Sequence, residues 1–451
     1  MITAKHALAV LSTIVTCLGA ALASDAPAKS PAPAARPHPK IIMLTKEPMA
    51  TPPSTSYCVA NFGVHCYQPF QMISAYNVGP LHADGIDGRG VTIVIVDSFG
   101  SPTIASDLQV FDQSFGIQDP PSFKIIQPAG PVPAFDPTDA TMVGWAGETT
   151  LDVEWAHVYA PGASILLVET PVAETEGVTG FPEIVAAENY VIDHELGDVI
   201  SQSFAATEET FPGPESIFAL RSAYFNAAKH RVTVLAASGD EGATSQEANG
   251  TDLYPYRVNS WPSTDPLVTS VGGSQLTLDD TGARLAPDVV WNDGYGAGGG
   301  GVSAVFRRPQ FQDPVGAVVG KYRGTPDISM SAACDGGVWT YSSYPPFGPG
   351  FNLICGTSEA TPSFAGIVAM SIQLAGHRLG TLGQALYHLD ANRIVDIYLG
   401  NNSFGPFTNS DGNTYTVIGY NAVPGYDLAS GLGTLDANRF VRALALRHDD
   451  D

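Results

Sequence analysis

Basic residues are scarce in this sequence of 451 residues: 21 Lys and Arg stand against 45 Asp and Glu, for a formal net charge of -24. At neutral pH a chain of this charge repels nucleic acid and anionic lipid, so neither is an expected partner. Near pH 4, roughly the pKa of a free carboxyl group, most of that charge would vanish.

Long apolar runs are absent except for one near the N-terminus. After a lone Lys5, residues 7–21 are apolar and end in the small-residue pattern Ala21-Leu22-Ala23, which predicts a secretory signal over residues 1–23. No other run approaches the roughly 20 residues that span a bilayer. We therefore expect a secreted protein, extracellular or periplasmic, without a membrane segment after signal removal; a membrane anchor is the alternative.

Cysteine is also rare, with five residues, and Cys17 lies within the predicted signal. The other four are an even number in an oxidising compartment, which favours two disulfides. Four cysteines allow three pairings, and nearness in sequence favours Cys58 with Cys66 and Cys334 with Cys355. Four free thiols are the alternative.

Large apolar residues are few in residues 24–55, which are dense in Pro, Ala and Ser. This composition predicts an extended linker or a short propeptide. Residues 56–449 contain no internal repeat and no second long linker, and the whole chain is 44% hydrophobic and 15% charged. We expect one large catalytic domain with an ample core.

Apolar, β-branched runs alternate with longer amphipathic stretches throughout this domain. The runs end at Asp97, Glu169, Phe204 and Asp240. This alternation predicts βαβ units, and hence an α/β fold in which a parallel sheet is flanked by helices. Polar residues follow the strands at Asp97, Ser203 and Asp240, and open α/β sheets place their sites at this edge.

The segment from Cys355 to Gly376 places Ser358 between a tight glycine-containing turn and an apolar helix. Pro362 fits only the first turn of such a helix. A serine there has an exposed hydroxyl near the positive end of the helix, which suits attack on a carbonyl. The segment GTSEATP also resembles the nucleophile segment of the subtilisin superfamily. An ordinary serine N-cap is the alternative.

None of the 10 histidines stands in the HGTH-like helix start that supplies the base of an ordinary subtilisin. Between the first two strands, however, the stretch 147–163 is predicted to be a helix with a Pro-Gly stop. Glu148 and Asp152 are i and i+4 on it, so they share one face and could share a proton as a coupled pair. A solvated acidic face is the alternative.

His157 is the one rival base on this helix. It follows Glu148 by nine residues, about 900° of rotation at 100° per residue, which places it on the opposite side. We therefore interpret His157 as a packing or surface histidine.

The segment AASGDEGA, residues 236–243, resembles the subtilisin segment whose asparagine donates a hydrogen bond to the oxyanion, with Asp240 in the place of the asparagine. An ionised aspartate would repel an oxyanion, whereas a protonated one donates as asparagine does. This role requires low pH. Otherwise Asp240 is a turn residue before Gly242.

Together Glu148, Asp152, Asp240 and Ser358 resemble the catalytic tetrad of the sedolisin family, the serine-carboxyl peptidases. The order Glu-x-x-x-Asp, Ser-Gly-Asp, Gly-Thr-Ser carries the resemblance, which runs from about Cys66 to Leu435 and covers most of the mature chain. It implies a subtilisin-like fold and hydrolysis of polypeptide substrates through an acyl-enzyme on Ser358. Glu148 would be the base, Asp152 would orient it, and a protonated Asp240 would complete the oxyanion hole.

An unperturbed glutamate titrates near pH 4.3, about two units below histidine, so this base would work in acid. Because Asp240 must also stay protonated, we expect a pH optimum on the order of 3 to 5. We expect a monomeric endopeptidase, with a tripeptidyl-type exopeptidase as the alternative. A binding protein on a decayed peptidase scaffold and a histidine-dependent subtilase using Asp97 and His157 are alternatives of other classes.

Near the C-terminus, VDIYLGNNS and GYNAVPGYDLASGLG resemble the calcium-binding loops of the same family. Carried over by position, one calcium ion would take the carboxylates of Asp396 and Asp427 and the backbone carbonyls of Ile397, Val423 and Gly425. The family usually has glycine where Val423 stands, which a backbone ligand tolerates unless φ is positive there. Polar loops without a metal are the alternative.

Two further departures bear on function. The segment 24–55 is short where the family has a long prodomain, which leaves activation open. Phe204 and Ala205 replace the Trp-Gly that the family shows beside the substrate strand, so Ser203 and Phe204 are the expected substrate contacts. The run Gly298–Gly301 lacks the Lys-Ser/Thr of a phosphate loop. We interpret that run as a flexible turn, with peptide contact as the alternative.

Overall fold

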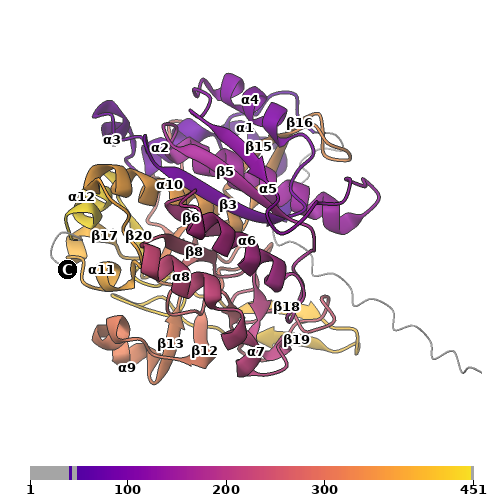
Figure 1. Cartoon of the computed structure of the whole chain (residues 1–451), viewed down its shortest axis with the longest axis vertical. Coiled ribbons are helices and arrows are strands. Elements are labelled where there is room, and N and C mark those ends of the chain that lie inside the picture. Colours follow the sequence, from indigo (N-terminus) through magenta and orange to yellow (C-terminus); the bar gives the residue numbers. More distant parts are fainter. Residues whose placement is uncertain (1–39, 43–47, 448–451) are drawn as a thin grey trace, which may run out of the picture. The chain divides into compact units, whose positions relative to one another are not determined.

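β-branched runs build the main sheet of the computed structural model, which describes residues 40–42 and 48–447 (Figure 1). Within these residues the sheet has eight strands in the order β11-β10-β8-β6-β3-β5-β4, with β14 also paired to β10. All pairs are parallel except β10 with β11, so the predicted parallel sheet is confirmed with one antiparallel addition. The bounds are β3 Thr92–Ser98, β4 Phe123–Ile126, β5 Ser164–Thr170, β6 Val199–Gln202, β8 Thr233–Ala237, β10 Thr269–Gln275, β11 Val289–Val290 and β14 Ile328–Ser331.

The register of the parallel strands brings their carboxyl ends to one edge of the sheet. Asp97 of β3 is opposite Glu169 of β5, and Val96 is opposite Gln202 of β6. Gln202 is in turn opposite Ala236 of β8. The polar residues at the ends of these strands therefore gather at one edge, where α/β folds place their sites.

Helices cover both faces of the sheet, because alternate strand residues point to opposite sides. Ile93 and Ile95 of β3 belong to the core under α5 (Ala140–Tyr159) and α10 (Thr357–Ala375). Val94 and Val96 pack on the other side with α6 (Phe181–Asp193) and α8 (Ser222–His230). Since α5 and α10 contact each other on the same face, the helix of Glu148 lies beside the helix of Ser358.

A second sheet, in the order β1-β16-β15-β2, leads directly into α10, because β16 ends at Cys355. Its bounds are β1 Lys40–Ile42, β2 Cys66–Tyr67, β15 Gly337–Ser342 and β16 Gly350–Cys355. The two-stranded pairs are β7 Ala206–Thr207 with β9 Ser260–Trp261, β12 Gly301–Arg307 with β13 Tyr322–Thr325, β17 Ile394–Val395 with β20 Thr434–Leu435, and β18 Phe404–Thr408 with β19 Thr414–Val417. The other α-helices are α1 Thr55–Phe62, α2 Pro69–Ala75, α3 Gly79–Ala83, α4 Ile104–Phe115, α7 Pro214–Ala219, α9 Gly316–Val319, α11 Gly383–Tyr387 and α12 Ala437–Arg447, and short 3₁₀ helices span Glu208–Thr210, Gln310–Val315 and Ala391–Arg393.

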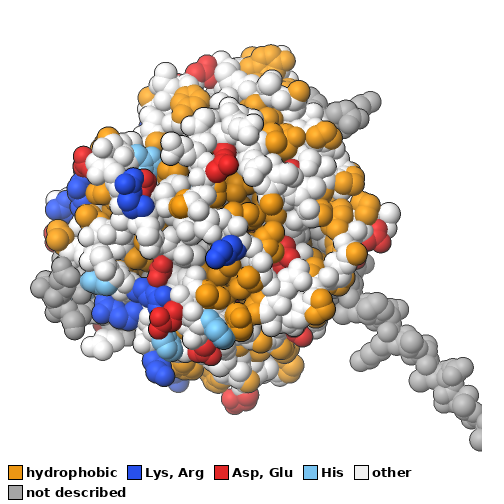
Figure 2. All heavy atoms as spheres, turned by 45° about the horizontal axis from the view of Figure 1, so that its top comes forward, with side chains coloured by type: hydrophobic (Ala, Val, Ile, Leu, Met, Phe, Trp, Pro, Cys, Tyr) orange, Lys and Arg blue, Asp and Glu red, His pale blue; other side chains and the backbone are white. Residues whose placement is uncertain are grey.

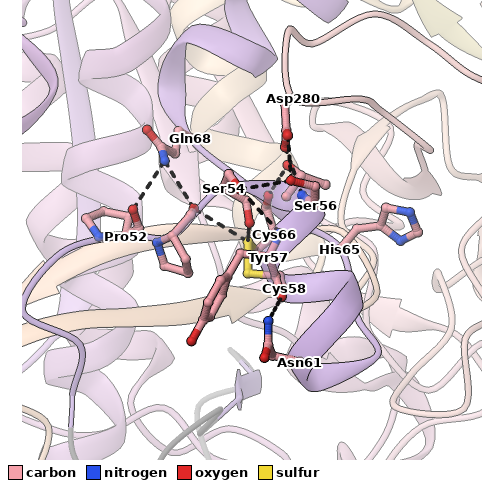
Figure 3. The surroundings of a disulfide bond; sticks show 12 residues. Pro52, Ser54, Ser56, Tyr57, Cys58, Asn61, His65, Cys66, Gln68 and Asp280 are labelled. Atoms are coloured by element: carbon pink, nitrogen blue, oxygen red, sulfur yellow. Dashed lines mark hydrogen bonds between the residues drawn. A yellow bond between two sulfur atoms is a disulfide. The ribbon is translucent and has the colours of Figure 1, made fainter.

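Both disulfides join the cysteines that were paired from the sequence. Cys58 of α1 is bonded to Cys66 of β2, in the surroundings that Figure 3 shows. Cys334, in the loop after β14, is bonded to Cys355. The second disulfide therefore ends two residues before α10 begins.

The N-terminal region differs in part from the predicted linker. Residues 40–42 form β1, antiparallel to β16, and Met49 pairs with Phe351. Pairing with a sheet edge satisfies backbone groups, which composition alone does not reveal. The signal predicted for residues 1–23 lies outside the described residues and stays a prediction. None of the described helices is long and apolar enough to cross a membrane.

All described residues belong to one compact unit. On the face shown in Figure 2, Lys and Arg side chains gather toward one side and are otherwise sparse. That face therefore has no extended basic surface of the kind that binds nucleic acid.

Candidate active site

Ser358 lies in the first turn of α10, just after the turn that follows β16. Gly356 precedes this helix with φ 129°, a conformation that residues with a side chain rarely adopt. A Cβ on Gly356 would also lie 2.5 Å from Oδ2 of Asp240. Glycine is required here on both counts, and its small size lets the Asp240 carboxyl approach the start of the Ser358 helix.

Glu148 and Asp152 lie on α5 and are fully buried, rather than on a solvated acidic face. The helix begins at Ala140, earlier than predicted, because the Asp139 side chain accepts hydrogen bonds from the backbone N–H groups of Thr141 and Met142 and caps it. The i, i+4 spacing places both carboxyl groups on one side of the helix, as expected from the sequence.

The Ser358 hydroxyl and the Asp152 carboxyl are the hydrogen-bonding groups beside Glu148. Neither Glu148 oxygen has a partner at full hydrogen-bond geometry, so these contacts are loose. Catalytic contacts of this kind commonly tighten only when substrate binds. Asp152 is held more firmly, because its Oδ1 accepts a hydrogen bond of 3.0 Å from Ser203 Oγ.

A third carboxyl group, Asp97 at the end of β3, belongs to the same cluster. Burial raises the pKa of Glu148 well above its usual value, and the charge of Asp97 raises it further. Burial also raises the pKa of Asp152, with the charges of Glu148 and Asp97 adding to the effect. Burial raises the pKa of Asp97 to about 7. Since like charges this close disfavour each other, the three groups titrate together and retain protons in acid.

From the sequence, Asp97 is a polar residue at a strand end, and its place beside Glu148 and Asp152 was not predicted. The parallel pairing of the strands could have predicted this place, because it brings the end of β3 to the edge of the sheet where sites form in α/β folds. His157, by contrast, is buried away from this cluster. Its Nε2 lies 2.8 Å from the Gln118 carbonyl and 3.4 Å from Asp112, as expected of a packing histidine.

Asp240 follows β8 and is fully buried. Its Oδ1 accepts hydrogen bonds from the backbone N–H and from the hydroxyl of Thr357, both at 2.8 Å. The Thr357 hydroxyl oxygen also accepts a bond of 3.1 Å from the backbone N–H of Gly239. Because two donors hold Oδ1, Oδ2 is the oxygen on which a proton would reside. The contacts tie Asp240 to the residue that precedes Ser358.

The run Gly298–Gly301 supports the Asp240 loop rather than forming the flexible turn that we predicted. Gly299 N–H donates to the Gly239 carbonyl at 2.7 Å, and Ser238 Oγ donates to the Gly299 carbonyl at 2.7 Å. A Cβ on Gly299 would overlap the Ser238 carbonyl oxygen. The physical reason for glycine is therefore close backbone packing.

Ser203 and Phe204, the predicted substrate contacts, both have buried side chains that face other groups. The Ser203 hydroxyl bonds to Asp152, and the Phe204 ring packs against Trp145 and Phe181. Burial of Phe204 follows from its place in the core under α6. Both side chains are thus occupied by contacts within the protein, and their contact with substrate stays a prediction.

The five residues predicted as calcium ligands are brought together by two loops. Gly425 N–H donates to Asp396 and Val423 N–H donates to Asp427, both at 2.9 Å, while Ser430 Oγ donates to the Ile397 carbonyl at 3.3 Å. Val423 is not among the described non-glycine residues with positive φ, so the substitution is compatible with a backbone ligand. No three His, Cys, Asp or Glu side chains of the described chain could hold a metal, so a cation here would depend on carbonyl oxygens.

Comparison with known proteins agrees with this geometry. A model of the subtilase family matches residues 140–381, which include all four predicted catalytic residues. Kumamolisin from Bacillus sp. (strain MN-32) is 32% identical over 387 residues, 84% of this chain and 63% of that protein. Sedolisin from Pseudomonas sp. (strain 101) is 30% identical over 286 residues, 60% and 46% of the two chains. Tripeptidyl-peptidase sed5 from Aspergillus fumigatus is 31% identical over 241 residues, 47% and 38%.

A solved structure extends the comparison to the fold. Pseudomonas sedolisin, a serine-carboxyl proteinase complexed with two molecules of pseudo-iodotyrostatin, matches with a TM-score of 0.71 and 25% identity. The match covers 85% of this chain and 99% of that chain. The chain spans 63% or less of the three curated relatives named above. The subtilisin-like fold predicted from the sequence is confirmed.

Proposed function

Because this chain belongs to the sedolisin peptidases of the subtilase family, we propose that it is a secreted, acid-active serine-carboxyl endopeptidase with Ser358 as nucleophile. One observation carries the proposal: two buried carboxyl groups flank one serine. Glu148 lies beside the Ser358 hydroxyl, and Asp240 is bonded to Thr357. The base and the oxyanion donor would then both be carboxyl groups, a combination that can work at acidic pH.

In the proposed reaction, Ser358 Oγ attacks the carbonyl carbon of the scissile peptide bond while its proton moves to an ionised Glu148. The tetrahedral intermediate collapses, the C–N bond breaks, and Glu148 returns the proton to the leaving amine. Water then attacks the acyl-enzyme, with Glu148 taking and returning its proton in the same way. The second product is a free acid, and Ser358 is regenerated.

Asp152 and Asp240 have separate duties in this scheme. Asp152, held by Ser203, orients Glu148 and shares its proton, so that only one charge resides on the pair. A proton on Oδ2 of Asp240 would make the donor that stabilises the oxyanion. If Asp240 ionises, the donor becomes a repelling charge and turnover stops.

The pH range follows from the same groups. A peptide bond is cleaved only while the coupled cluster of Glu148, Asp152 and Asp97 carries a negative charge that Glu148 can hold and while Asp240 is protonated. The raised pKa of Glu148 sets the acid limit of activity and the ionisation of Asp240 sets the other limit, and we place the optimum in acid, on the order of pH 3 to 5. Burial raises the pKa of Asp97 to about 7, so a further negative charge enters the cluster as neutrality is reached. We expect activity to be largely lost by about pH 7.

Digestion of an unfolded protein substrate across pH 2 to 8 tests the proposal. Wild type is expected to cut in acid, and Ser358→Ala to lose at least about 10³-fold in kcat. Ser371→Ala is the matched control, because that serine lies on the same helix and its hydroxyl bonds to the Ile367 carbonyl. Absence of acid activity, or activity that survives Ser358→Ala, would overturn the proposal in favour of a binding protein.

A tripeptidyl exopeptidase is the second candidate, because one relative carries that activity in its name. Mass spectrometry of the same digests separates the two. Internal fragments of mixed length support an endopeptidase, whereas a ladder of tripeptides from the amino end supports the exopeptidase.

We also propose that the loops around Asp396 and Asp427 bind one calcium ion. The two carboxylates and the carbonyls of Ile397, Val423 and Gly425 form an all-oxygen set, which a hard cation prefers. The contacts already described support a preformed arrangement of these loops. When bound, the ion would supply positive charge and fix the loops, with no direct part in peptide cleavage.

A further inference from the structure

The loop 332–336 is tied to the Ser358 turn and takes no direct part in the proposed reaction. Its Cys334 is bonded to Cys355, and Ser358 follows three residues later. The backbone N–H of Gly356 also donates to the Ala332 carbonyl at 2.8 Å. Both cysteines are fully buried. Movement of this loop must therefore move the turn that carries the serine.

The other end of the loop is held by His65. Asp335 Oδ1 accepts hydrogen bonds from both the backbone N–H and the Nδ1 of His65, each at 2.7 Å. Gly336 N–H donates to the His65 carbonyl at 3.1 Å. His65 is in turn fixed by its neighbour Cys66, which is bonded to Cys58 and pairs with Gly337. Figure 3 shows the His65 ring pointing away from that disulfide.

We propose that His65 and Asp335 are positioning residues: their ion pair, formed when His65 is protonated, holds the loop 332–336 and through Cys334–Cys355 the Ser358 turn. The inference rests on the proposed role of Ser358 for its effect on catalysis. Whether the pair holds the loop 332–336 in place, however, does not depend on the peptidase activity. Acid would thus act twice, once on the catalytic carboxyl groups and once on the support of the nucleophile.

A second carboxylate and two neutral groups surround the pair. Asp335 N–H donates to Asp293 Oδ2 at 2.7 Å, so a second carboxylate lies nearby, and Gln275 Nε2 donates to the Asp335 carbonyl at 3.2 Å. The ring of Tyr67 is 6.3 Å from that of His65 and adds no charge in acid. Burial opposes ionisation of Asp335, but the hydrogen bonds from His65 outweigh it and hold the pKa of Asp335 below its usual value.

The pH dependence has a definite sign. Protonation puts a positive charge on the imidazole of a histidine, and the hydrogen bonds from His65 keep the pKa of Asp335 below its usual value, so this carboxyl stays ionised further into acid. A charge-assisted hydrogen bond is roughly twice as strong as a neutral one. The pair is therefore stronger while the imidazole is protonated, in acid, than when Nδ1 donates only as a neutral group.

Position matters here because the contact between Ser358 and Glu148 is loose. A displacement of about 1 Å at a reacting group can cost on the order of 10²-fold in rate. A turn that is free to shift would spend less time in the reactive geometry. The expected consequence is a lower kcat with little change in KM.

Opening of the loop is measured by reduction of Cys334–Cys355 in Ser358→Ala protein, which cannot digest itself. A phosphine reductant is applied at pH 4 and pH 7, followed by alkylation and mass spectrometry of the peptides that contain these cysteines, with oxidised glutathione as the reference disulfide. We expect reduction, relative to the reference, to be about tenfold slower at pH 4 than at pH 7.

Three variants decide the result. His65→Gln is expected to reduce the pH difference to within about twofold, and His65→Lys, charged at both pH values, to keep reduction slow at both. His194→Gln is the control, since His194 is an exposed histidine stacked on Tyr190, and should behave as the parent. If His65→Gln and Asp335→Asn both keep the parental pH difference in the reduction rate, the inference is overturned. Should His65→Gln fail to fold, the result of Asp335→Asn alone is decisive.

Kinetics provide the second readout. At pH 4, His65→Gln and Asp335→Asn should lower kcat about three- to tenfold with KM within about twofold, and His65→Lys should restore most of it. An unchanged kcat in both variants would contradict a positioning role. If the parent shows no acid activity, the proposed function fails. The reduction assay still decides whether the pair of His65 and Asp335 holds the loop 332–336.

Discussion

Two sets of buried carboxyl groups in this molecule are stabilised in opposite ways. The two oxygens of the Asp327 carboxylate each accept a hydrogen bond from the buried Arg323 guanidinium, at N–O distances of 2.8 and 2.6 Å. Asp327 also accepts a hydrogen bond of 2.8 Å from the Tyr387 hydroxyl. Asp97 and Glu148 are equally buried, yet none of their carboxyl oxygens has a full hydrogen-bond partner in the described chain. One set is neutralised by a fixed cation, the other by protons.

The difference separates structure from chemistry. The guanidinium of Arg323 keeps its positive charge at every pH of interest, because it does not deprotonate in proteins, so Asp327 always has a cation beside it. A buried carboxyl group without a cation must exchange protons with the solvent as the pH changes. Only the second kind can serve as a base that takes and returns a proton, and such groups occur here beside Ser358.

The largest expected effect comes from Glu148→Gln, which removes the base but keeps its shape. We expect kcat to fall by about 10³- to 10⁴-fold at pH 4, because an amide cannot accept the serine proton. Stability should not fall, since a buried acid is replaced by a neutral group. Steady-state kinetics and urea unfolding check the two statements. Full activity in Glu148→Gln would show that the protonated cluster is only structural.

Arg323→Met tests the opposite set. Removal of the cation leaves Asp327 buried and uncompensated, so we expect a loss of about 3 to 5 kcal/mol in the free energy of unfolding. Urea unfolding in the Ser358→Ala background measures it without self-digestion. The double variant Arg323→Met/Asp327→Asn should recover part of the loss. If the single variant is as stable as its parent, Arg323 is not what stabilises Asp327.

A third expected effect is loss of stability on the alkaline side. Burial raises the pKa of Glu188 to about 8 and that of Glu208 to about 7, above their values in the unfolded chain. Stabilisation by such groups is complete below the unfolded pKa, near 4.3, and is lost as the pH rises through the folded pKa. We expect Tm of Ser358→Ala to fall by at least about 5 °C from pH 4 to pH 8. A Tm that rises over this range would contradict the comparison.

Calcium would be a further way to neutralise carboxylates, at Asp396 and Asp427. With free calcium at about 100 times Kd, binding contributes about 2.7 kcal/mol to the stability of the folded protein. Chelation should therefore lower Tm by a few degrees at constant pH. Asp396→Ala should lower Tm without chelator and abolish the response to it. An unchanged response in that variant would place the ion elsewhere.

The sequence was sufficient for the parts of this site that depend on periodicity. The four strands ending near Asp97, Glu169, Phe204 and Asp240 were predicted, because apolar runs of that length are typical of buried parallel strands. The shared face of Glu148 and Asp152 follows from the 3.6-residue turn of a helix. Both disulfides followed from nearness in sequence.

Other parts depend on contacts between distant segments, which no local pattern encodes. Asp97 joins the cluster through the register of β3, and the Ser203 hydroxyl donates a hydrogen bond to Asp152. The strand β1 lies in the segment that was interpreted as linker from its Pro, Ala and Ser content; composition does not show this strand, because a sheet edge can pair with almost any extended segment. The pair of His65 and Asp335 joins residues 270 positions apart.

The glycine run beside the Asp240 loop has a consequence for how the protein tolerates mutation. Gly298 and Gly299 lie against the backbone of Gly273 and Ser238, where any side chain would need the space that those backbones occupy. In a library of all single substitutions selected for activity, both positions should therefore reject even alanine. Residues on the exposed surface should accept most replacements. A map of tolerated substitutions would thus outline the support of the site without reference to any substrate.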